Sequence, residues 1–170
     1  MKKFILFLIL IYSNSIIAQN YNNVNSEDFK VNGLINIFTT KDSLKKAFPK
    51  MKVVKIDQDH CMFDSEEYYK TKFYNYSKNG IKFLVYDKEA HLQEINFKEN
   101  PETFLMYKDF KINKNTSVKE LQKYFPKSYK YFMKEKGKIF RLKWGEEFDG
   151  ELQFEIKNNK VINVYDWMPC

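Results

Sequence analysis

The sequence predicts an α+β protein built from two tandem units, each a short helix followed by about four antiparallel strands. The first observation is a repeat: residues 35–50 and 112–127, 77 positions apart, are identical at half of their positions without a gap. The second is that β-rich runs with alternating apolar residues follow each copy, which is typical of strands with one buried face. We therefore expect the same helix-plus-sheet unit to occur twice in tandem.

Residues 1–18 have the layout of a secretory signal peptide. Lys2 and Lys3 precede a short apolar stretch, and Ala18 is a small residue at the expected cleavage point. The apolar stretch is shorter than the roughly 20 residues that cross a bilayer, and no cysteine follows the cut to carry a lipid. We therefore expect an exported protein, periplasmic or secreted, without a stable membrane anchor.

Composition argues against nucleic acid as a partner. Without Lys2 and Lys3 the chain carries 27 basic and 22 acidic residues, and Arg141 is its single arginine. Recognition of phosphates and base edges favours the two-pronged arginine side chain over lysine. We interpret the lysines as a solvated surface, with weak attraction to anionic surfaces as the alternative.

The remaining chain divides at changes of composition. Residues 19–30, rich in Asn and Ser, are expected to form a flexible leader. The first unit is assigned to 31–99 and the second to 110–170. The linker 100–109 lies between them and begins at Asn100-Pro101.

In the first unit, Thr39 or Thr40 can cap a helix whose apolar face holds Leu44 and Phe48, and Pro49 ends it. A tight hairpin turn is predicted at Asn79-Gly80. The expected strands are 52–56, 69–76, 81–86 and 91–97, with a loop at 87–90.

In the second unit, Ser117 and Glu120 have the spacing of a capping box. Leu121 and Phe125 recur on one helix face, and Pro126 is expected to end the helix. The expected strands are 128–133, 138–144, 151–157 and 161–167, with turns at Asp149-Gly150 and Asn158-Asn159.

The segment 111–126, KINKNTSVKELQKYFP, resembles the helix-opening segment of the β-lactamase inhibitor protein and of the small outer-membrane assembly lipoproteins. The resemblance covers this segment and the tandem plan of 31–170 in outline. Asn115-Thr116-Ser117 stands where that family has Gly-Met-Thr. The resemblance implies a non-enzymatic module that binds another protein with its sheet.

The two cysteines, Cys61 and Cys170, form an even pair in a chain expected to enter an oxidising compartment. A disulfide between them would close a long loop and stabilise the fold by roughly 4–5 kcal/mol in the chain-entropy model. Two free thiols, or an intermolecular bond through Cys170, are the alternatives.

One segment contains residues with potential for chemistry. Asp57, Asp59, His60, Cys61 and Asp64 are all competent metal ligands. Their spacing matches no established closed site, so a solvated loop is the favoured interpretation and a metal-dependent hydrolase the alternative. We expect no catalytic, cofactor or metal residues.

Aromatic residues are dense in the first unit and recur near the end of the chain. Such side chains are favoured in protein interfaces, although cross-strand aromatic pairs on an ordinary sheet are the favoured explanation. The candidate partner surface consists of Tyr68, Tyr69, Phe73, Tyr74, Tyr76, Trp144 and Trp167. The predicted function is an exported protein-binding module of inhibitor or envelope-accessory type, with a structural envelope protein as the alternative.

Overall fold

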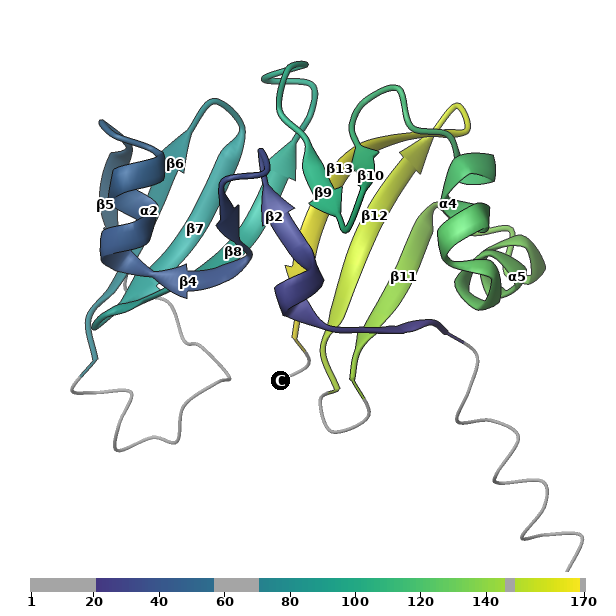
Figure 1. The fold of residues 1–170 in the computed structure, drawn as a ribbon, viewed down its shortest axis with the longest axis horizontal. Coiled ribbons are helices and arrows are strands. Elements are labelled where there is room, and N and C mark those ends of the chain that lie inside the picture. Colours follow the sequence, from purple (N-terminus) through teal and green to yellow (C-terminus); the bar gives the residue numbers. More distant parts are fainter. Residues whose placement is uncertain (1–20, 57–70, 146–148, 169–170) are drawn as a thin grey trace, which may run out of the picture.

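The computed structural model describes residues 21–56, 71–145 and 149–168. Within these ranges the fold is α+β, with strands in two mostly antiparallel sheets and three short α-helices. Figure 1 shows the smaller sheet in front of the larger one, with helices at both ends of the larger sheet. The α+β class is as the sequence predicts.

The larger sheet has nine strands, eight of which lie in the order β1-β11-β12-β13-β8-β7-β6-β5, while β4 pairs with β8. The strands are β1 (Asn23–Val24), β4 (Phe38–Thr40), β5 (Lys52–Ile56), β6 (Phe73–Lys78), β7 (Ile81–Tyr86), β8 (Glu89–Asn96), β11 (Ile139–Trp144), β12 (Glu151–Lys157) and β13 (Lys160–Trp167). Antiparallel pairing of β13 with β8 joins two hairpin meanders into one sheet.

The hairpin turns explain why several strands begin and end where the sequence predicts. Asn79 and Gly80 have φ values of 50° and 74°, and Asn158 and Asn159 have 51° and 60°. Both pairs therefore adopt the left-handed conformation of type I′ turns, which fits the twist of paired strands. The predicted strands 52–56, 81–86 and 151–157 are confirmed at both ends. The expected 87–90 loop is shorter, because β8 begins at Glu89.

Two of the helices, α2 (Lys41–Ala47) and α4 (Val118–Tyr124), begin at the predicted caps. The Thr40 hydroxyl accepts a hydrogen bond from the Ser43 backbone N–H at 3.2 Å. Ser117 and Glu120 form the full capping box, with each side chain accepting from the other residue's backbone N–H. These bonds satisfy N–H groups that would otherwise lack partners at a helix start.

The third helix, α5 (Pro126–Lys134), corrects the sequence prediction of a strand at 128–133. Pro126 does not only end α4; it also occupies the first turn of α5, where its missing N–H costs nothing. Tyr129, Tyr131 and Phe132 are residue types that are common in strands. In the helix, Phe132 instead packs against Phe140 of β11, with ring centroids 5.8 Å apart.

The smaller sheet has four strands in the order β10-β9-β2-β3. They are β2 (Phe29–Val31), β3 (Ile35–Asn36), β9 (Leu105–Tyr107) and β10 (Phe110–Ile112), and a short 3-10 helix, η1 (Ser26–Asp28), precedes β2. Strand β1 thus lies within the expected leader 19–30, β2 begins in it, and β9 lies within the expected linker 100–109. Phe29 is fully buried, so these segments belong to the fold.

The main core lies between the larger sheet and the layer formed by the helices and the smaller sheet. Rings from both layers meet there: Phe125 of the helical layer lies 6.4 Å from Phe140 of β11, and Phe140 lies 6.2 Å from Phe154 of β12. The fully buried phenylalanines are Phe29, Phe83, Phe97, Phe125, Phe140 and Phe154. Core filling therefore accounts for much of the high aromatic content.

The start of α5 is capped by a residue more than one hundred positions away. Asn22 Oδ1 accepts hydrogen bonds from the backbone N–H groups of Lys127 at 3.0 Å and Ser128 at 3.1 Å. The Ser128 hydroxyl accepts in turn from the Asn22 N–H at 2.9 Å. The residue that precedes α5 makes no side-chain cap bond. Asn22 therefore caps this helix from a distant part of the chain.

Replacing Asn22 by alanine is therefore expected to lower the free energy of unfolding by about 1–2 kcal/mol, the usual loss on removing a helix cap. Urea denaturation followed by tryptophan fluorescence measures it. Asn25→Ala is the matched control, since the Asn25 side chain makes no cap bond at η1. Equal losses in the two variants would contradict the long-range cap.

Candidate functional site

One face of the nine-stranded sheet carries mainly polar side chains, together with a small separate cluster of buried residues, Phe73, Leu84 and Tyr86. On β11, Phe140 and Leu142 are buried against the helical layer, whereas Arg141 and Lys143 alternate with them and point the other way. In the other half, Lys41 of α2 lies 5.8 Å from the ring of Tyr74 on β6, so Phe73 and Asn75 lie on the opposite face. We call this opposite face the open face.

A single row of residues crosses the open face in register over seven strands. Directly opposite residues of antiparallel strands share a face, so the strand order and register of the sheet determine the members of this row. It runs Arg141, Gln153, Tyr165, Glu94, Lys82, Ser77 and Lys52, from β11 to β5. We call it the polar row.

Hydrogen bonds between side chains fix the polar residues at the β11–β13 end of the open face in position. Arg141 Nη1 donates to Glu151 Oε2 at 2.9 Å, and Gln153 Nε2 donates to the same oxygen at 2.7 Å. Further along, Asn163 Nδ2 donates to Glu94 Oε1 at 2.9 Å. Because Glu151 is 7% exposed and carries a charge, its two donors are needed to offset its desolvation.

Two aromatic residues of β13 lie beside this network. Trp167 is paired with Glu151 and Tyr165 with Gln153 in the sheet register. Trp167 is 41% exposed. Burial, followed by the nearby Glu155 charge, raises the pKa of Tyr165, so its hydroxyl stays protonated at neutral pH. We call Arg141, Tyr165 and Trp167 the face patch.

The structure separates the aromatic residues that the sequence groups into one partner surface. Phe73, Tyr76 and Trp144 are buried, at 3%, 7% and 4% exposure. Tyr74 is half-buried and packs against the main core. Trp167 is the exposed member of the set among the described residues, so these five side chains do not form one exposed surface.

The other sequence candidates lie outside the described residues. These are Tyr68 and Tyr69 of the aromatic set, the Asp57–Asp64 segment, and both Cys61 and Cys170. The disulfide and the ligand segment remain predictions from the sequence.

The sequence reading missed Arg141 and Tyr165 as members of a shared surface. One signal was present: Tyr165 and Trp167 are two positions apart in a strand, which places them on one face. Pairing of β13 with β8, which brings Glu94 beside Tyr165, joins residues about 70 positions apart. Spacing within the sequence carries no information on that register.

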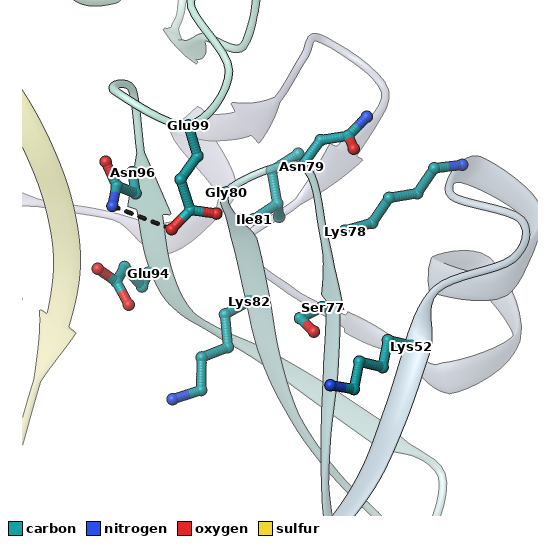
Figure 2. A pocket seen from close by; sticks show the side chains of 10 residues that line it. All are labelled: Lys52, Ser77, Lys78, Asn79, Gly80, Ile81, Lys82, Glu94, Asn96 and Glu99. Carbon is teal, nitrogen blue, oxygen red and sulfur yellow. Dashed lines mark hydrogen bonds between the residues drawn. The ribbon is translucent and has the colours of Figure 1, made fainter.

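At the β5–β7 end, the open face holds a shallow cavity of about 400 Å³. Figure 2 shows Lys52, Ser77 and Lys82 on three adjacent strands. Lys78 also lines it and donates to the Pro49 carbonyl at 2.6 Å. Two acids complete the lining, and both accept hydrogen bonds: Glu94 from Asn163, and Glu99 from Asn96.

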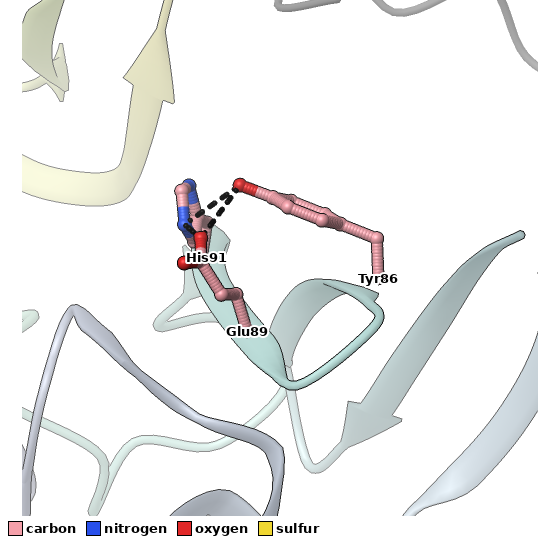
Figure 3. A network of polar contacts seen from close by, with 3 residues as sticks. All are labelled: Tyr86, Glu89 and His91. Atoms are coloured by element: carbon pink, nitrogen blue, oxygen red, sulfur yellow. Dashed lines mark hydrogen bonds and ion pairs between the residues drawn. The ribbon is translucent and has the colours of Figure 1, made fainter. Parts of the chain in front are cut away.

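Tyr86, Glu89 and His91 form a triangle of polar contacts on β7 and β8 (Figure 3). Tyr86 Oη lies 3.1 Å from Glu89 Oε2 and 3.0 Å from His91 Nε2, and that nitrogen lies 3.2 Å from Glu89 Oε2. Burial lowers the pKa of His91, against the raising effect of Glu89, and burial followed by the Glu89 bond raises the pKa of Tyr86. Both are therefore neutral at pH 7, and each of the three residues contacts the other two, whereas His91 Nδ1 is buried without a hydrogen-bond partner among the described residues.

The described residues contain no group of three or more His, Cys, Asp or Glu side chains placed to hold a metal ion. In the same part of the chain, no helix is long and apolar enough to cross a membrane. Comparison with known proteins found no matching family model, no matching curated protein and no matching solved structure.

Proposed function

We propose that this chain is an exported, non-enzymatic protein-binding module that engages its partner through the open face of the nine-stranded sheet. The observation that carries the proposal is the face patch. Tryptophan, tyrosine and arginine are the residue types that dominate binding energy in protein interfaces, and one of each surrounds the Glu151 network. The export part rests on the signal-peptide layout of residues 1–18.

The hydrogen-bonded network favours binding over a purely structural role. Glu151, Gln153 and Arg141 are fixed by one another before any partner arrives. A preordered surface loses less side-chain entropy on binding. Trp167 at the border of this network offers a large apolar area to a partner.

We also infer that the two halves of the chain are copies of one unit. Equivalent contacts support this at the two helix caps, which lie 77 residues apart, with strand partners that lie 71 residues apart. Thr40 pairs with Glu89 just as Ser117 pairs with Lys160. The two caps have nearly equal backbone angles: φ −88° and ψ 152° at Thr40, φ −85° and ψ 158° at Ser117.

The helix ends repeat as well. Phe48 N donates to the Leu44 carbonyl at 2.8 Å, and Phe125 N donates to the Leu121 carbonyl at 2.8 Å. In this interpretation the paired strands β8 and β13 are equivalent to each other, and the polar row crosses from one copy to the other between them. The two ends of the polar row differ. The end in the first copy is rich in lysine, and the end in the second copy contains the face patch.

A retention experiment tests the binding proposal. The mature chain, residues 19–170, is immobilised and exposed to envelope and culture-supernatant proteins of the producing organism. We expect a protein that the unmodified chain retains and that a Tyr165→Ala, Trp167→Ala double variant binds at least about tenfold more weakly, because loss of a hot-spot residue costs about 2 kcal/mol.

The control is a Leu34→Ala, Met133→Ala double variant, which removes apolar side chains that are 61% and 54% exposed outside the face patch. It should retain the partner unchanged. Equal retention by all three proteins would contradict binding through the face patch. Retention of no protein would favour the structural envelope alternative.

A further inference from the structure

The helical segment at residues 114–138, which contains α4 and α5, is strongly basic. It holds eight lysines and two glutamates, a net charge of +6, whereas the rest of the mature chain 19–170 holds 19 basic and 20 acidic residues. All eight lysines are exposed, and one of the two acids, Glu120, is engaged in the capping box of α4. The segment therefore presents a surplus of positive charge to the solvent.

Three of these lysines lie on one face of α5. Lys127, Lys130 and Lys134 are three and four positions apart, which places them in one row along the helix. No Asp or Glu stands three or four positions from any of them, and Glu135, next to Lys134 in the chain, lies about 100° around the helix from it. Met133 borders the row and is 54% exposed. We call Lys127, Lys130, Met133 and Lys134 the basic face.

The opposite side of α5 belongs to the core, and this fixes the direction of the basic face. Ser128 is buried, and Phe132 packs against Phe140 of β11. Because Phe140 points into the core, α5 lies against the side of β11 that is opposite to the open face. The basic face and the face patch are therefore separate surfaces of the molecule.

Helix α2 also carries lysines, but it lacks two features of α5. Asp42 stands three and four positions before Lys45 and Lys46, where opposite charges on a helix attract each other. In addition, none of the large apolar side chains that are exposed belongs to α2. Figure 1 places α2 and α5 at opposite ends of the larger sheet. The combination of a lysine row without a neighbouring acid and an exposed apolar side chain is therefore specific to α5.

The residue types of the basic face select its occupant. Lysine is depleted in protein interfaces, and recognition of nucleic acid favours arginine, which α4 and α5 do not contain. Lysines clustered on a helix are attracted to a layer of anionic headgroups, and an apolar side chain among them can reach the boundary of the acyl chains. We propose that the basic face binds reversibly to a membrane surface that contains anionic phospholipid, which leaves the open face available to a protein partner.

Co-sedimentation of the mature chain with vesicles tests the proposal. One set of vesicles contains phosphatidylcholine and phosphatidylglycerol, and the other contains phosphatidylcholine alone. We expect binding to the anionic vesicles in about 50 mM NaCl, at least about tenfold weaker binding in about 500 mM NaCl, and no measurable binding to the neutral vesicles. A Lys127→Gln, Lys130→Gln, Lys134→Gln variant should bind the anionic vesicles at least about tenfold more weakly, because each lysine near such a surface contributes about fivefold. Met133→Ala should bind them about threefold more weakly, because it removes apolar area without changing the charge.

The matched control is a Lys45→Gln, Lys46→Gln, Lys88→Gln variant, which removes the same charge at the α2 end of the sheet. It should bind within about twofold of the unmodified chain, because salt screens charges more than about one Debye length from the headgroups. Glutamine matches lysine in helix propensity, and circular dichroism and the Tm establish that both triple variants are folded.

Equal binding to neutral vesicles, equal losses in the two triple variants, unchanged binding by Met133→Ala, or no binding at low salt would overturn the proposal. So would vesicle binding that the α5 variant leaves unchanged. If that variant instead loses the protein retained by the mature chain, the basic face belongs to an acidic protein. We expect the α5 variant to retain that protein as the unmodified chain does, so failure of the membrane proposal and failure of the face-patch proposal are seen separately.

Discussion

Gly80→Ala is expected to lower the free energy of unfolding by about 3–4 kcal/mol, because two effects add at this position. Gly80 has φ +74° in the β6–β7 turn, where a side chain is disfavoured. A Cβ there would lie 2.5 Å from the Asn96 carbonyl oxygen, so the backbone of β8 has to move. That movement also disturbs the 2.7 Å bond from Asn96 N to the Gly80 carbonyl.

Gly33→Ala separates the two effects. Gly33 has a similar φ of +70°, but a Cβ there would meet only ring atoms of Phe104, at 3.9 Å and beyond. It should therefore show the backbone strain alone, about 1–2 kcal/mol. Urea denaturation of both variants measures the difference. A Gly80→Ala loss no larger than that of Gly33→Ala would show that the close approach to Asn96 is not a constraint.

Asp166→Asn is expected to stabilise the protein by about 2–4 kcal/mol at neutral pH. Asp166 of β13 is partly buried, and Trp144 Nε1 donates to its Oδ1 at 2.7 Å. Burial raises the pKa of this carboxyl from 3.8 to about 7, although the Trp144 bond acts in the opposite direction. An asparagine oxygen can accept the same bond without a charge to desolvate.

The sign of the pH dependence follows from proton binding. Between about pH 4 and pH 7 the folded carboxyl keeps a proton that the unfolded chain has lost, so the contribution of Asp166 to stability falls as pH rises through this window. The advantage of Asp166→Asn should therefore be absent below pH 4 and complete above pH 7.

Urea denaturation at pH 4 and pH 8 measures this difference. Asp109→Asn is the control, since Asp109 is exposed in the β9–β10 turn, and it should change little at either pH. A gain of equal size at both pH values would show that ionisation of Asp166 is not the cause.

Local signals in the sequence predict the elements that local chemistry determines. The capping box at Ser117 and the Asn79-Gly80 turn fix their neighbours through bonds within a few residues, and both are confirmed. Pro126 was misread because proline is compatible with the end of one helix and the start of the next.

The elements that the sequence did not reveal depend on distant partners. Strands β1, β2 and β9 have two or three residues each and form through pairing with segments far along the chain. The polar row is similar: each of its members is an ordinary polar residue of a half-buried strand. They become one surface only through the register of seven strands, above all that of β13 against β8.

The contact between Asn22 and the start of α5 has a consequence for the order of folding. If the chain is exported from its N-terminus, Asn22 crosses first, and its partners Lys127 and Ser128, over one hundred residues later, cross among the last. Contacts so distant in sequence form slowly, since the intervening chain must first be brought together. The segment that is translocated earliest would therefore wait longest for its native position, and folding would be completed only after translocation of nearly the whole chain.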